Sequence, residues 1–106
     1  MGIDEMTVQE IVRRVLTVAR PDKIILFGSA ATGAMTRDSD IDLLVVEPGS
    51  RDRHEESLRI EEALDDLEHP FDVVVMSKEW FEDTKDLVGG ISYPANKYGK
   101  VIYETA

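Results

Sequence analysis

Two aspartates stand at alternate positions where an apolar run begins. Asp40 and Asp42 lead into Leu43-Leu44-Val45-Val46, whose composition indicates a buried strand. Because side chains alternate along a strand, the two carboxylates project from one face, about 6.5–7 Å apart along the backbone. At that spacing both can lean toward one cation, and without a cation each raises the pKa of the other. The pattern favours a divalent-metal site at the end of a sheet. The alternative is a pair of solvated acids at a strand edge.

A glycine-serine pair ends the preceding apolar run. Lys23 to Phe27 reads as a short buried strand that ends at Gly28. Glycine permits a tight turn and the close approach of a ligand to the backbone, while Ser29 offers a hydroxyl and an amide. The small residues that continue to Gly33 can begin a short helix whose free amides face a phosphate. We therefore expect Gly28, Ser29 and Gly33 to bind phosphates. The alternative is an ordinary tight turn.

A third acid, Asp72, opens the next predicted strand, Phe71 to Met76. The segment between Gly28 and Asp40 is too short for a full helical crossover, so the first two strands are predicted to be antiparallel. A helix predicted from about Ser50 to Glu68 makes the third strand parallel to the second. These connections bring the three acids and the glycine turn to one end of the sheet. The alternative for Asp72 is a strand-entry residue that binds nothing.

Three carboxylates beside a phosphate-binding turn suit nucleotidyl transfer. Asp40 and Asp42 are predicted to hold metal that bridges the oxygens of a nucleoside triphosphate. Asp72 is predicted to help bind a second metal or to accept the proton of the attacking hydroxyl. Transfer of a phosphate group needs mainly positioning and charge neutralisation, so a small site suffices.

Helices on either side of these strands must hold the site in place. Thr7-Val8-Gln9-Glu10 fits the pattern of a capping box, and apolar residues from Val8 to Ala19 follow helical spacing. Ser77 is predicted to cap a further helix that carries Trp80 and Phe81 and extends toward Leu87 and Val88.

The order of elements predicts an α/β fold of the α+β kind, with a mixed β-sheet and helices packed on it. Residues 100–104 are either a short last strand or a docked tail. The 106 residues form one predicted domain, 1–106. Because a single lobe supplies one wall of a cleft, a partner chain or a second copy of this one is expected to supply the other.

Charge and cysteine content exclude several classes of function. The chain has 12 Lys and Arg against 22 Asp and Glu, a net charge of −10. Such a surface repels phosphate backbones, so extended nucleic acid is a poor partner and a basic protein surface a better one. The absence of cysteine excludes disulfides, zinc-thiolate sites and a cysteine nucleophile. No run has the length of a membrane span and none resembles a signal peptide, so we expect a cytoplasmic protein without membrane contact.

At the residues of the predicted site the sequence resembles the polymerase-β-like nucleotidyltransferase superfamily, specifically its minimal nucleotidyltransferase (MNT) branch. The family pattern is a Gly-Ser turn, a further glycine, an Asp-x-Asp strand start and a later acid, matched here by Gly28-Ser29, Gly33, Asp40-Ile41-Asp42 and Asp72. The resemblance extends from about Ile11 to Tyr103. Many small members are antitoxin-like partners of helical HEPN ribonucleases, and some transfer AMP from ATP to a tyrosine of the toxin. The resemblance therefore implies a transferase that uses Mg²⁺ and ATP and acts as antitoxin to a HEPN-type toxin.

One position departs from the family pattern. Members often carry arginine just before the second glycine, where this chain has Thr32, and Lys23 and Arg37 are the candidates to replace that cation. The departure and the single lobe keep a second function open: a non-catalytic module that binds nucleotide or neutralises a toxin by covering it. Transfer to a small molecule is a third, although relatives of that kind usually have a further substrate domain.

Overall fold

The computed structural model describes residues 3–33, 39–49, 52–67 and 69–105. Its elements are, in chain order, α1 (Glu5–Val18), β1 (Lys23–Phe27), α2 (Ser29–Thr32), β2 (Ile41–Glu47), α3 (Arg53–Ala63), β3 (Phe71–Ser77), α4 (Lys78–Thr84), α5 (Ser92–Tyr98) and β4 (Lys100–Glu104). The four strands form one sheet in the order β3-β2-β1-β4. β1 is antiparallel to β2 and to β4, while β2 and β3 are parallel. The predicted mixed sheet and both predicted strand connections are confirmed.

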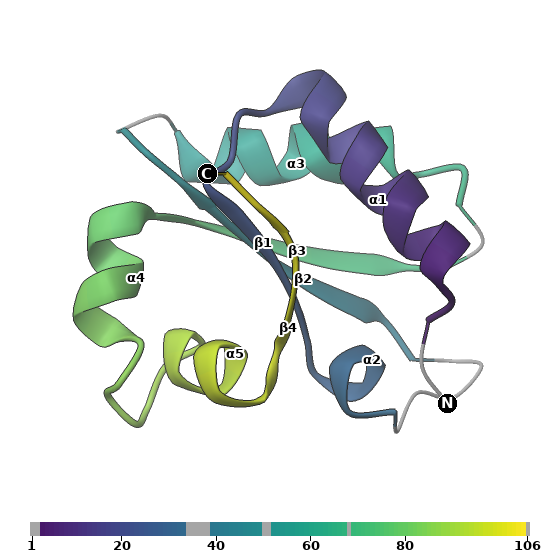
Figure 1. Cartoon of the computed structure of the whole chain (residues 1–106). Helices are drawn as coiled ribbons and strands as arrows, with labels where there is room; N and C mark the ends of the chain where they lie inside the picture. Colours follow the sequence, from purple (N-terminus) through teal and green to yellow (C-terminus); the bar gives the residue numbers. More distant parts are fainter. Residues whose placement is uncertain (1–2, 34–38, 50–51, 68, 106) are drawn as a thin grey trace.

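Helices cover both faces of the sheet: α1 and α3 lie on one face, and α4 and α5 on the other (Figure 1). β2 lies inside the sheet, between β3 and β1. This position explains why apolar and polar residues do not alternate in its sequence after Asp42. Leu43 and Val45 pack into the core under α1 and α3, whereas Leu44 and Val46 pack into the core under α4 and α5. A strand that is buried on both faces needs an unbroken apolar run.

The start of α1 differs from its prediction. The carboxylate of Asp4, not the hydroxyl of Thr7, caps the helix, and it accepts a hydrogen bond of 2.8 Å from the Thr7 amide. The carboxylate of Glu10, which a capping box would turn back toward the helix start, is bound instead by the guanidinium groups of Arg13 and Arg14. The capping-box prediction is therefore wrong, because a better acceptor stands three residues earlier and two arginines compete for the glutamate.

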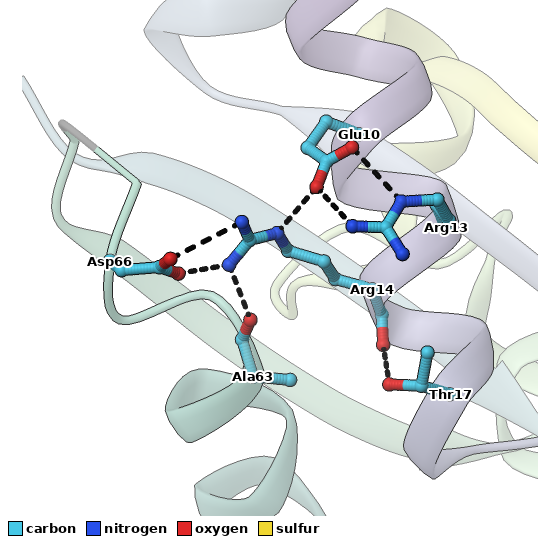
Figure 2. A network of polar contacts seen from close by, with 6 residues as sticks. All are labelled: Glu10, Arg13, Arg14, Thr17, Ala63 and Asp66. Atoms are coloured by element: carbon cyan, nitrogen blue, oxygen red, sulfur yellow. Dashed lines mark hydrogen bonds and ion pairs between the residues drawn. The ribbon is translucent and has the colours of Figure 1, made fainter.

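A polar network joins α1 to the end of α3 (Figure 2). The Arg14 guanidinium donates to Glu10 at 2.7 Å, to the carbonyl oxygen of Ala63 at 3.2 Å and to the carboxylate of Asp66. Asp66 lies between α3 and β3, so this contact links α1 to the crossover that makes β3 parallel to β2.

The two predicted helices after β2 are present but shorter than expected. The helix predicted from about Ser50 to Glu68 is α3, which is capped by the Asp52 carboxylate. The Ser77 hydroxyl accepts a 3.1 Å hydrogen bond from the Trp80 amide, so its capping of α4 is confirmed. α4 ends at Thr84, which leaves Leu87 and Val88 beyond the helix on the surface.

A helix that the sequence did not predict, α5, precedes the last strand. Pro94 lies in its first turn, where the missing amide costs no intrahelical hydrogen bond. Gly99 then turns the chain into β4, where a Cβ atom would stand 2.3 Å from the carbonyl oxygen of Ala95 and 2.7 Å from Ile25 Cγ2. Residues 100–104 are thus a strand and not a docked tail.

Candidate active site

The starts of β2 and β3 lie side by side at one end of the sheet. Asp42 is the in-register neighbour of Asp72 across the parallel pair, and on its other side it is opposite Phe27, the last residue of β1. Adjacent strands are separated by about 4.8 Å. Two of the three predicted acids are therefore direct neighbours in the sheet, although 30 residues separate them in the sequence.

Both carboxylates point to the face that carries α4 and α5. Leu44 and Val74, each two residues further along its strand, pack with the core on that face, and residues two apart on a strand share a face. Asp40 precedes β2 and is exposed. The three acids thus open toward one side of the sheet, at the end where β1 turns into α2.

One contact that the sequence did not reveal holds this end together. The amide of Ile41 donates a 2.8 Å hydrogen bond to the carbonyl oxygen of Pro70, two residues before Asp72. This bond extends the β2–β3 ladder into the segments that carry Asp40 and Asp72. A backbone hydrogen bond of this kind follows from the parallel pairing of the strands. It does not depend on which side chains are present, so the sequence carries no signal for it.

The turn at Gly28 contacts the acids directly. Gly28 has φ +70° and ψ −150°, and a Cβ atom built there would stand 2.3 Å from Asp42 Oδ2. A residue with a side chain would be strained and would displace the carboxylate. The predicted adjacency of the Gly28-Ser29 turn and the Asp-x-Asp pair is confirmed, and glycine is required at this position by both conformation and space.

The electrostatics agree with that geometry. Burial raises the pKa of Asp42 above its ordinary value, and the negative charges of Asp72 and Asp40 raise this pKa further. Each of the other two acids is thus close enough to repel Asp42. A cation placed among them would relieve this repulsion.

Across residues 3–33, 39–49, 52–67 and 69–105, no three acidic or histidine side chains are grouped closely enough to hold one metal ion. The structure therefore offers a carboxylate pair with a third acid nearby, not a closed three-acid cage. Mg²⁺ fits such an open donor set, because it is usually bound through one or two carboxylates and takes its other ligands from water and phosphate oxygens.

Gly33 has a conformational role in the fold. It ends α2 in the left-handed conformation, with φ +79°, and its amide donates to the carbonyl oxygen of Ser29. A Cβ atom at Gly33 would meet nothing within 4 Å. Binding of phosphate by Gly28, Ser29 and Gly33 stays a prediction.

Of the two candidate cations, Lys23 lies at the wrong end of the sheet. It begins β1, four residues or about 13 Å from Phe27. Its ammonium group is 3.3 Å from the Glu104 carboxylate and 5.4 Å from the centre of the Phe81 ring. Lys23 therefore cannot replace the arginine that is absent at Thr32. Arg37 lies outside the described residues.

Comparison with known proteins gives a family match over most of the chain. The model of the family described as "Nucleotidyltransferase domain" matches residues 6–94, which include the Gly-Ser turn and all three acids. A comparison with curated protein sequences gave no match. No helix in the part of the chain that the structure describes is long and apolar enough to cross a membrane.

Several solved structures share the fold. A toxin–antitoxin complex with AMP-PNP aligns with a TM-score of 0.62 and 24% identity over 92% of this chain and 73% of the other. A candidate nucleotidyltransferase from Sulfolobus solfataricus aligns with a TM-score of 0.62 and 17% identity, over 93% and 79%. An MNT antitoxin from Shewanella oneidensis, in complex with its tri-AMPylated HEPN toxin, aligns with a TM-score of 0.58 and 20% identity, over 97% and 74%. The predicted fold class is confirmed.

Proposed function

Because this chain belongs to the nucleotidyltransferase domain family, we propose that it transfers AMP from ATP to a hydroxyl of a HEPN-type toxin, releases pyrophosphate, and thereby acts as an antitoxin in the cytoplasm. The family match makes it a nucleotidyltransferase. The choice of donor is supported by the fold neighbour that binds AMP-PNP, and the choice of acceptor by the neighbour whose HEPN toxin is AMPylated.

The observation that carries the proposal is the meeting of Asp42, Asp72 and Gly28 at one end of the sheet. In this assignment Asp40 and Asp42 hold Mg²⁺, and Gly28, Ser29 and Gly33 line the path of the phosphates. Mg²⁺ held by these carboxylates would supply the positive charge that neutralises the phosphate oxygens. Because Gly28 has no side chain, the triphosphate can approach the Asp42 carboxylate closely.

Asp72 is exposed at the start of β3, where an acceptor hydroxyl can reach it. In the proposed reaction the hydroxyl oxygen bonds to the α-phosphorus, the bond from that phosphorus to the bridging oxygen breaks, and pyrophosphate leaves with the bond electrons. Asp72 accepts the hydroxyl proton or completes a second metal site, and in either role it lowers the cost of forming the nucleophile.

A non-catalytic module that covers the toxin is the second candidate, and one observation favours it. Thr32 stands where arginine is common, and its hydroxyl lies 3.4 Å from the carbonyl oxygen of Gly28 and 3.5 Å from that of Ser29. Thr32 is thus directed back onto its own turn and supplies no cation to the triphosphate.

Transfer of label separates the two candidates. The chain is incubated with ATP labelled on the α-phosphate, Mg²⁺ and a purified HEPN-type toxin. We expect label on the HEPN protein with the wild type and with Glu104→Ala, an exposed acid opposite Lys23 at the other end of the sheet, but at least a hundredfold slower labelling with Asp40→Ala and Asp42→Ala. A tight complex that never acquires label supports the covering module and contradicts the enzyme.

A further inference from the structure

A hollow with mainly apolar walls lies between α4 and the start of α5. Its volume is about 470 Å³, and Trp80, Leu87, Val88 and Ile91 line it. These four side chains, here called the apolar docking surface, are 57%, 61%, 83% and 41% exposed. Large apolar side chains gathered around one hollow are uncommon on the surface of a monomer and mark a site of interaction.

The polar groups near the floor of this hollow already have partners. The Thr84 hydroxyl lies 2.6 Å from the carbonyl oxygen of Trp80 and 2.7 Å from the Ser92 hydroxyl, which in turn lies 3.3 Å from Met76 Sδ. The hollow therefore offers apolar contact and few free hydrogen-bonding groups. Such a site suits apolar side chains of another protein better than a polar small molecule.

The apolar docking surface and the acids lie on the same face of the sheet. Met76 borders the hollow and follows Asp72 on β3, and both point to the face covered by α4 and α5. The step of four residues from Asp72 to Met76 spans about 13 Å. A protein seated on the docking surface can therefore place one of its hydroxyls at the acids and supply the cleft wall that a single lobe lacks.

Charge around the hollow limits what can bind there. The residues that line the hollow are uncharged. The helix and turn that form it, α4 and the residues after it, carry four exposed acids and two lysines: Glu79, Glu82, Asp83 and Asp86 against Lys78 and Lys85. Of these, Glu82 and Lys85 are paired at 2.9 Å. The whole chain has a net charge of −10. Like charges oppose the docking of a second copy or of an anionic membrane, whereas a basic border on the partner would complement the acids.

We propose that the apolar docking surface binds the acceptor protein through an apolar helix face bordered by lysine and arginine. A helix laid in an apolar groove is a recurrent mode of recognition, in which apolar residues at helical spacing fill the groove. The identification of the docked protein as the acceptor rests on the proposed function, whereas the chemistry of the docking face does not.

The fluorescence of Trp80 reports directly on this surface, because Trp80 is the one tryptophan in the chain. The probe is a synthetic amphipathic helix of about 18 residues, or five turns, with a leucine face and a lysine border. Of two comparison peptides, one has a glutamate border in place of the lysine border, and the other has the residues of the lysine peptide in scrambled order. We expect saturable binding of the lysine peptide to the full chain with a blue shift of Trp80 emission, and at least tenfold weaker binding of both comparison peptides.

Surface variants locate the binding without disturbing the core. Val88→Asp is expected to weaken binding of the lysine peptide at least tenfold. Met6→Asp changes an equally exposed position on α1 (81%) and is expected to leave binding of the peptide unchanged. The proposal is overturned if the glutamate peptide binds as tightly as the lysine peptide, or if Met6→Asp weakens binding as much as Val88→Asp does. So does a blue shift that grows with chain concentration alone or with anionic vesicles, because it assigns the surface to a second copy or to a membrane.

The binding assay and the transfer assay test the docking surface and the proposed function independently of each other. Asp42→Ala is expected to bind the lysine peptide as the wild type does while it loses transfer of AMP. Val88→Asp is expected to retain Mg²⁺-dependent binding of AMP-PNP while it loses the peptide. Transfer without any role for the docking surface contradicts this inference alone, and docking without transfer contradicts the proposed function alone.

Discussion

Alanine in place of Gly28 perturbs the contact between the β1–α2 turn and the acids at its closest point. The added Cβ would stand 2.3 Å from Asp42 Oδ2, but 3.3 Å and 3.6 Å from Asp42 Cγ and Cβ. Rotation of the carboxylate can therefore relieve the worst overlap. The backbone strain stays, because φ +70° with ψ −150° is a conformation that almost only glycine adopts.

The expected loss of stability follows from that strain. A residue held in such a region costs about 1–3 kcal/mol, and for a domain of this size each kcal/mol lowers the melting temperature by about 4–8 °C. The rotated carboxylate is displaced from the position proposed for metal binding, and a displacement of about 1 Å can slow a reaction roughly a hundredfold. Gly28→Ala should thus remain folded but lose most transfer of AMP.

Urea unfolding and the labelled-ATP assay measure the two effects, and Gly49→Ala is the matched control. Gly49 also has positive φ (+97°), but its Cβ would meet nothing within 4 Å, and it follows β2 at the end of the sheet opposite the acids. We therefore expect Gly49→Ala to lose stability through backbone strain while its rate of AMP transfer stays close to that of the wild type. When Asp42 is also replaced by alanine, the loss of stability that Gly28→Ala causes through overlap with the carboxylate should disappear. Only the loss caused by backbone strain should remain. Wild-type stability and rate in Gly28→Ala would refute the reasoning.

Two further predictions concern charge. Asp72→Asn removes a negative charge beside Asp42 and should stabilise the chain in EDTA by about 0.2–1 kcal/mol, measured by urea unfolding; a loss of stability would contradict the repulsion that raises the pKa of Asp42. Hydrogen bonds from Arg13 and Arg14 lower the pKa of Glu10 from 4.5 to about 2. The depressed pKa adds stability that is complete above pH 4.5 and is lost as the pH falls toward 2. Glu10→Gln should therefore narrow the difference between unfolding midpoints at pH 7 and pH 3, and an unchanged difference would show that this pairing contributes nothing.

Much of the sheet could be predicted from the sequence because local residue patterns fix strand type. The unbroken run from Leu43 to Val46 requires a strand buried on both faces, and the alternate spacing of Asp40 and Asp42 fixes which face both acids share. The short connection before Asp40 and the longer one before Asp72 fix the strand directions. The sequence left Lys23 as a candidate cation, and the structure excludes it because Lys23 begins the strand that Gly28 follows.

Contacts between distant segments decided the rest. The register that sets Asp42 beside Asp72 and the approach of Gly28 to Asp42 Oδ2 depend on how three strands pair, and no local pattern carries that information. Tertiary packing also placed α5 over the sheet, although Pro94 and the nearby glycines read locally as a break. Residue types and spacing along the chain thus determined which groups could do chemistry here. The tertiary structure determined their distances, because pairing and packing act between residues that are remote in sequence.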